Sequence, residues 1–104
     1  MKSYEYDIFI PLFHNDGTPI NVSTIRGFQD RLLEEFGGLT VFPQPNEGYW
    51  QMGEVTYRDE IIIFRVVTTR KRAARRFLIP LKAELKRALR QEEILIIERD
   101  VETL

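Results

Sequence analysis

Cysteine is absent from the 104-residue chain, and histidine and tryptophan occur once each. Without cysteine the protein has no disulfide framework, no thiolate nucleophile and no cysteine-based zinc site. No apolar run approaches the ~20 residues that a membrane-spanning helix needs. We therefore expect a cytoplasmic protein without a membrane partner, and we expect no cofactor, no bound metal and no catalytic residue of a familiar motif.

The net charge of −1 conceals a separation of charge along the chain. Residues 1–69 contain ten Asp or Glu against five Lys or Arg, and residues 92–104 contain five acids against one arginine. Residues 70–91 instead contain nine basic residues against one glutamate. The positive charge is thus confined to one local block.

Hydrophobic periodicity predicts one α+β domain over residues 1–104. Alternating apolar residues predict strands at 6–12 and 61–67 and a hairpin over 49–57 that leads into the second of them. A short strand at 39–42 is expected to end in a proline-rich loop over 43–48, and a last strand is expected over 93–98. Helical spacing predicts one helix from Asn21 or Ser23 to Gly37 and another over 70–91, kinked at Pro80.

The order strand, helix, strand, strand, helix, strand predicts a ferredoxin-like two-layer sandwich. In that fold both helices cover one face of an antiparallel sheet, and strands 6–12 and 61–67 lie in its middle. Pro11 has no amide donor, so we expect a strand end or a bulge there. The residues expected to face the helices are Ile8, Ile10, Ile62, Phe64 and Val66.

Four segments resemble a family of short bacterial proteins that is frequent in cyanobacteria. They are Phe-Gly-Gly-Leu-Thr-Val-Phe-Pro at 36–43, Tyr49-Trp50, Tyr57-Arg58-Asp59-Glu60 and Gln91-Glu92-Glu93-Ile94. The resemblance covers most of the chain and implies the same fold. The family has no assigned function, so the resemblance implies no catalytic residues.

Arg65 is the only charge inside an otherwise apolar predicted strand. A buried charge must be paired or bind a ligand. On the structural interpretation its partner is Asp7, Glu60 or Glu98. On the alternative interpretation it faces a small-molecule pocket whose residues would be Arg65, Tyr57, Trp50, Tyr49 and His14.

Two further titratable residues have simpler interpretations. His14, with Asp16 two positions away, lacks further ligands for a metal, so we interpret it as an exposed turn residue. Asp7 precedes the apolar part of its strand, and we interpret it as a solvated charge at the sheet edge.

The face of the sheet without helices is expected to be apolar. Such a patch exceeds what monomers usually expose, which predicts a homodimer. The expected interface residues are Phe9, Phe13, Ile61, Ile63 and Val67.

The second predicted helix has a basic side, formed by Lys71, Arg72, Arg75, Arg76, Lys82, Lys86, Arg87 and Arg90. The side has no interleaved aromatic residues for base stacking, and Ile79 interrupts it. The rest of the chain is acidic and would repel a polyanion. We therefore predict a solvated or acid-paired face without tight nucleic-acid binding.

Three functions follow from these features. The leading hypothesis is a non-enzymatic, self-associating protein of unassigned role. The second is a ligand-binding protein or enzyme of the dimeric α+β barrel type, for which the sequence specifies no ligand. The third is nucleic-acid binding through the basic helix.

Overall fold

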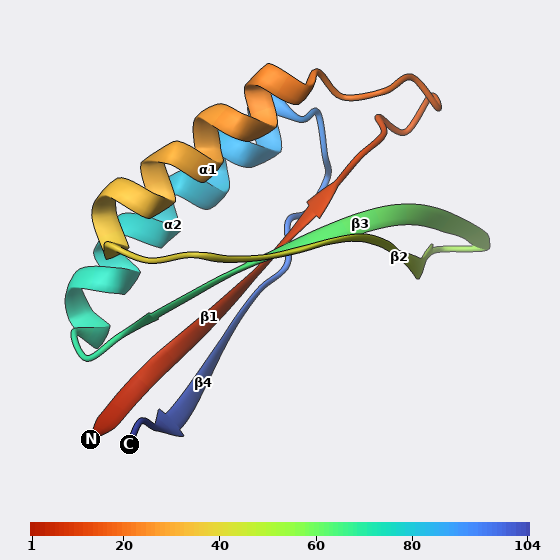
Figure 1. Cartoon of the computed structure of the whole chain (residues 1–104). Coiled ribbons are helices and arrows are strands. Elements are labelled where there is room, and N and C mark those ends of the chain that lie inside the picture. Colours follow the sequence, from red (N-terminus) through yellow and green to blue (C-terminus); the bar gives the residue numbers. More distant parts are fainter.

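The computed structural model describes all 104 residues, in the element order strand, helix, strand, strand, helix, strand (Figure 1). The elements are β1 (Lys2–Pro11), α1 (Val22–Phe36), β2 (Thr40–Met52), β3 (Val55–Thr68), α2 (Lys71–Ala88) and β4 (Ile96–Glu102). The strands form one antiparallel sheet in the order β2-β3-β1-β4, and both helices lie on the same side of it. The predicted ferredoxin-like α+β fold is therefore confirmed, with β1 and β3 at the centre.

The core fills the space between the helices and one face of the sheet. Ile8 and Phe64 are fully buried there, as predicted, and Ile62 packs against the same cluster. Removing each such side chain from water contributes ~1.5–3 kcal/mol. The helices supply the opposing side chains Ile25, Phe28, Leu32, Ala74, Leu78, Leu81 and Leu85. No helix has the length and the apolar content that crossing a membrane requires.

Helix α1 begins and ends at the residues that the sequence indicates. The Asn21 side chain accepts a hydrogen bond of 2.9 Å from the Ser23 amide, which satisfies one of the free N–H groups of the first turn. Gly37 ends the helix at φ 73° and donates its N–H to the carbonyl of Leu33. That backbone conformation strains any residue with a Cβ atom.

We expect Gly37→Ala to lower the free energy of unfolding by about 1 kcal/mol, because alanine would have to adopt the left-handed conformation. Urea denaturation measures this loss. Gly38→Ala is the matched control, since Gly38 lies outside the left-handed region and an added Cβ has open space. Equal losses in the two variants would contradict the assignment of the strain to position 37.

The predicted loop over 43–48 is wrong. Strand β2 continues from Thr40 to Met52, with a register shift against β3 between Phe42 and Asn46. Pro43 and Pro45 fall within that irregular stretch. Prolines lack the amide donor of a ladder, yet an edge strand tolerates them at a bulge. The turn residues therefore mark an irregularity within one strand.

The last strand lies further along the chain than predicted. It covers Ile96–Glu102, and Ile94 instead belongs to the connection that follows α2, where it is 1% exposed. The charged residues after Ile97 form the outer half of the strand and pair with β1 as far as Lys2. An edge strand tolerates charged residues at alternate positions. The apolar run at 94–97 therefore predicted the strand too early in the chain. Helix α2 ends at Ala88, three residues before its predicted end, and Pro80 lies within it.

Glu98 connects β4 to helix α2. Its carboxylate accepts hydrogen bonds from Arg75 at 2.8 and 2.6 Å and from the Tyr6 hydroxyl at 2.7 Å. The Arg75 guanidinium is the main cause that lowers the pKa of Glu98 from its ordinary 4.5 to about 2, and the Tyr6 hydroxyl adds to it while burial opposes it. The contact thus favours the ionised carboxylate.

This pKa shift predicts part of the acid denaturation of the protein. Because the pKa of Glu98 is lower in the folded state, its contribution is present above pH 4.5 and is lost as the pH falls from about 4.5 to about 2. We expect the melting temperature of Glu98→Gln to fall less than that of the wild type over this pH range. Glu102→Gln, at an exposed position of the same strand, should leave the fall unchanged. An unchanged profile in Glu98→Gln would contradict the assignment.

Candidate functional site

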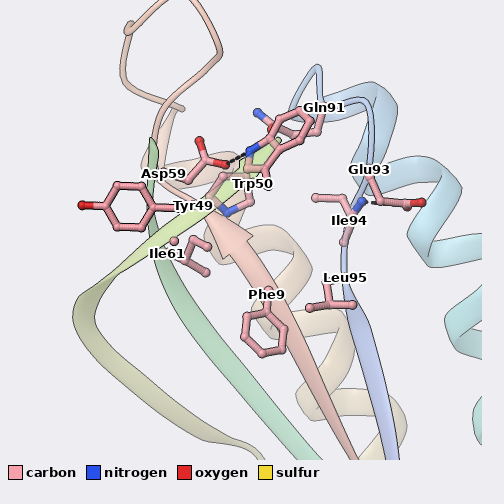
Figure 2. Close-up of a pocket in the computed structure, with 11 residues that line it drawn as sticks. Phe9, Tyr49, Trp50, Asp59, Ile61, Gln91, Glu93, Ile94 and Leu95 are labelled. Atoms are coloured by element: carbon pink, nitrogen blue, oxygen red, sulfur yellow. Dashed lines mark hydrogen bonds between the residues drawn. The ribbon is translucent and has the colours of Figure 1, made fainter. Parts of the chain in front are cut away.

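A pocket of about 380 Å³ lies where the end of β1 meets the β2–β3 hairpin and the α2–β4 connection (Figure 2). Phe9 and Ile61 contribute to it from the face without helices, because they alternate along their strands with the core residues. Its volume lies within the range of about 300–1,000 Å³ that is typical of small-molecule sites. The lining residues are Phe9, Pro11, Gly48, Tyr49, Trp50, Asp59, Ile61, Gln91, Glu93, Ile94 and Leu95.

Trp50 is held in place by its two neighbours on β3. Its indole N–H donates to Asp59 Oδ2 at 2.8 Å, as Figure 2 shows. Its ring stacks on that of Tyr57, with the ring centroids 4.6 Å apart and the planes 18° from parallel. Trp50 and Tyr57 are directly paired across the two strands, which places their rings side by side. The pocket therefore has one flat aromatic wall of fixed orientation.

The polar side chains of the pocket wall are acceptors or carry negative charge. They are the carboxylate of Asp59 and the amide of Gln91, whereas the carboxylate of Glu93 is turned away toward Lys82, and no Lys, Arg or His lines the pocket. Glu93 also contacts Lys82, at 3.0 Å, and the Ile94 amide, and these two contacts lower its pKa. Such a wall favours a ligand that donates hydrogen bonds or is positively charged, and it repels a phosphate.

The structure divides the predicted ligand-binding residues among different places. Trp50 and Tyr49 both line the pocket, but the Tyr49 ring points away from it (Figure 2), and its hydroxyl donates to Glu47 at 3.0 Å. Tyr57 and His14 line a neighbouring hollow of about 310 Å³, which shares Asp59 with the pocket. His14 Nδ1 lies 3.0 Å from the Leu89 carbonyl oxygen. Trp50 thus lines the pocket and Tyr57 lines the adjoining hollow. His14, predicted to be exposed, is half-buried because it lies against the end of α2.

Arg65 is ion-paired and lies outside the pocket. Its Nε and Nη2 donate to Asp7 at 2.7 and 3.0 Å, and its guanidinium lies 4.8 Å from the centroid of the Phe42 ring. This confirms the structural interpretation, with Asp7 as the partner. Glu5 lies 3.2 Å from the same guanidinium and 3.3 Å from that of Arg99.

The interpretation of Asp7 as a solvated edge charge is wrong. Asp7 is 3% exposed, because β1 lies between β3 and β4 and side chains from both strands, Arg65 and Arg99, lie against its carboxylate. It accepts hydrogen bonds from Arg65 and, at 2.8 Å, from Arg99. The Arg65 hydrogen bond is the largest cause of the lowered pKa of Asp7, and burial opposes it. Asp7 is the centre of a four-charge cluster, formed with Glu5, Arg65 and Arg99.

The residues predicted for a dimer interface are spread over the helix-free face and its border. Phe9 and Ile61 line the pocket, Ile63 is half-buried, and Val67 is exposed. Phe13 lies beyond the end of β1, in a bridge with Pro19. The dimer interface stays a prediction.

The basic side of α2 is only partly acid-paired. Arg75 binds Glu98 and Lys82 binds Glu93, while Lys71 lies 5.2 Å from the ring centroid of Tyr4. The basic residues of this side without an ion pair are Lys71, Arg72, Arg76, Lys86, Arg87 and Arg90. The absence of tight nucleic-acid binding stays a prediction.

Sequence reasoning did not assign the polar residues of the pocket. Asp59 lies on β3 and Gln91 and Glu93 lie on the α2–β4 connection, and only the fold brings these two distant segments together. The one available signal was the polar stretch at 91–93, which interrupts the pattern directly after the basic helix. This stretch indicated the junction between the helix and the next strand, and it indicated no functional role for its residues.

No family model and no curated protein sequence matches the chain. Among solved structures, the fold is similar to that of a phage SAM lyase in complex with S-methyl-5′-thioadenosine. The TM-score is 0.68 and the sequence identity is 12%, over 94% of this chain and 81% of the lyase. At this identity the likeness shows the fold.

This comparison corrects the leading functional hypothesis. The hypothesis of a non-enzymatic, self-associating protein rests on the missing catalytic motifs and on the apolar open face of the sheet. A solved protein with a similar fold is a lyase with a nucleoside bound. The reasoning failed because catalysis on a small ligand needs only a few side chains, which the fold gathers from distant segments without a sequence motif.

Proposed function

We propose that this protein is an enzyme that binds a sulfur-containing nucleoside in the pocket beside Trp50. The observation that carries the proposal is the pocket itself, which combines one fixed aromatic wall with polar side chains that accept hydrogen bonds. The likeness of the fold to a lyase in complex with S-methyl-5′-thioadenosine supports the same class of ligand.

The base, the ribose and the sulfonium group of such a nucleoside each have a suitable side chain in the pocket wall. A purine base stacks on an aromatic side chain with about 1–3 kcal/mol, and Trp50 offers its indole face for this. Ribose hydroxyls are donors, and the carboxylate of Asp59 is an acceptor. A sulfonium nucleoside such as S-adenosylmethionine adds a positive charge, which this carboxylate attracts. The ligand carries no phosphate, in keeping with a wall without basic residues.

The reaction that we propose is lyase-type cleavage of the sulfonium nucleoside. The bond between the sulfur and the amino-acid carbon breaks, and the sulfur takes its electron pair to become the neutral thioether. The departing four-carbon fragment forms a double bond, with loss of a proton to a carboxylate, or a ring with its own carboxylate. Asp59 is the side chain of the pocket that can accept such a proton.

Trp50 makes binding directly measurable, because it is the single tryptophan of the chain. We expect titration with S-methyl-5′-thioadenosine to change its fluorescence saturably. Asp59→Asn should weaken binding about tenfold, since a charged acceptor is lost. Glu47→Gln makes the same chemical change on the same hairpin, where Glu47 pairs with Arg58 outside the pocket, and it should leave binding unchanged.

Activity is tested separately, by incubating the protein with S-adenosylmethionine and following S-methyl-5′-thioadenosine by chromatography. The expected result is release of the thioether, reduced in Asp59→Asn and not in Glu47→Gln. Absence of binding at millimolar nucleoside, in both fluorescence and equilibrium dialysis, would overturn the proposed function. Binding without release would leave a nucleoside-binding protein.

We also propose that the protein acts in the cytoplasm as a homodimer. The helix-free face supports this, because apolar residues there surround the charge cluster of Glu5, Asp7, Arg65 and Arg99. Sedimentation velocity at micromolar concentration should give the mass of two chains. A single monomeric species under these conditions would refute the dimer and would not affect the proposed pocket.

A further inference from the structure

Gln91 is the most buried polar side chain of the pocket wall. It is 9% exposed and follows the turn that ends helix α2. Its backbone amide donates to the Lys86 carbonyl at 2.9 Å, and the preceding residue, Arg90, has a φ of 51°. The turn therefore fixes the position of Gln91 from its backbone.

Hydrogen bonds also fix the orientation of the Gln91 amide. Nε2 donates to the carbonyl oxygens of Leu89, at 3.1 Å, and of Phe13, at 3.4 Å. Carbonyl oxygens only accept hydrogen bonds, so the NH₂ group must face them and the amide cannot be reversed. The side-chain oxygen Oε1 has no partner within the chain.

This free oxygen is an unused acceptor on a residue of the pocket wall. No side-chain polar atom of the protein is both fully buried and without a hydrogen-bond partner, so Oε1 remains accessible. Gln91 lines the same pocket as Trp50 and Ile94, and Figure 2 shows the three around it. A ligand that fills the pocket without donating to Oε1 would leave a desolvated acceptor, at a cost of about 1–3 kcal/mol.

We infer that Gln91 selects the base of the nucleoside by accepting a hydrogen bond from an exocyclic amine. The inference rests on the proposed function and names the base that the pocket takes. Adenine has an amine at carbon 6, whereas hypoxanthine has a carbonyl oxygen there. With the base stacked on Trp50, the adenine amine donates a hydrogen bond to Gln91 Oε1. The hypoxanthine carbonyl is itself an acceptor, so it would repel Oε1. The pocket is therefore specific for the aminopurine.

The first experiment changes the ligand and leaves the protein intact. Fluorescence titrations of Trp50 compare S-methyl-5′-thioadenosine with the corresponding inosine, in which the amine alone is replaced. We expect the adenine compound to bind at least about tenfold more tightly. Equal affinities would overturn the role of Gln91 while the nucleoside proposal stands. If neither compound binds, both proposals fall.

The second experiment removes the acceptor. Gln91→Met keeps the length of the side chain, and we expect it to weaken binding of the adenine compound about tenfold while the inosine compound is unaffected. Gln51→Met makes the same change at an exposed position of β2 outside the pocket, and it should preserve the preference. Preference for adenine in Gln91→Met equal to that of the wild type would overturn the inference. Should that variant not fold, the comparison of ligands decides alone.

Discussion

Replacement of Asp7 by asparagine is expected to lower the free energy of unfolding by about 3 kcal/mol. Asp7 is 3% exposed and accepts hydrogen bonds from both Arg65 and Arg99. Removing the anion from a buried pair leaves uncompensated positive charge, which typically costs about 3–5 kcal/mol. We take the lower end, because both arginine side chains are more than a third exposed and water screens them partly.

Urea denaturation of Asp7→Asn at neutral pH measures this loss. Asp100→Asn is the matched control, since Asp100 lies on the exposed side of β4, 3.9 Å from Lys2, and should cost less than about 0.5 kcal/mol. The lowered pKa of Asp7 sets the sign of the pH dependence. The contribution is present above the ordinary pKa of 3.8 and is lost as the pH falls below it, so the two proteins should converge in acid. Equal stability of Asp7→Asn and the wild type at pH 7 would contradict the role of the cluster.

Replacement of Trp50 by alanine is expected to weaken binding of S-methyl-5′-thioadenosine about thirtyfold. Loss of one base-stacking side chain costs about 1–3 kcal/mol, and the middle of this range corresponds to such a factor. The variant has no tryptophan, so isothermal titration calorimetry replaces fluorescence. Trp50→Phe keeps a ring and loses the hydrogen bond to Asp59, and its affinity should be intermediate.

Tyr49→Ala is the control for the aromatic wall. Tyr49 is the neighbouring aromatic residue, yet its ring points away from the pocket and its hydroxyl bonds Glu47. Its removal should change the affinity less than about threefold. A thirtyfold loss in Tyr49→Ala, or none in Trp50→Ala, would show that the base lies elsewhere.

The parts of the fold that depend on local pattern were predictable from the sequence. Alternation placed Ile8 and Phe64 in the core, and the chemistry of Asn21 and Gly37 placed the ends of α1. The partner of Arg65 was predictable as one of three acids, because opposite charges on adjoining strands are the common solution. In each of these inferences, the position of a residue within its helix or strand determines which way its side chain faces.

The remaining features depend on which elements become neighbours. Asp7 was misinterpreted because its contact with Arg99 depends on the pairing of β1 with β4. The sequence alone does not show this pairing. The pocket joins the end of β1 to Trp50 and to Gln91, and no local pattern encodes that meeting. Pro43 and Pro45 indicated a loop because their effect depends on whether the strand has a neighbour on both sides. Sheet order decides all three cases.

The two prolines of β2 also affect how copies of this protein can meet. A free sheet edge invites strand addition by another chain, which is a common route to aggregation. On β2 the prolines remove two amide donors, and the register shift between Phe42 and Asn46 bends the strand locally. On the opposite edge, β4 carries Glu98, Arg99, Asp100 and Glu102. Both borders of the sheet therefore resist edge-to-edge growth, which leaves its open face for specific contacts.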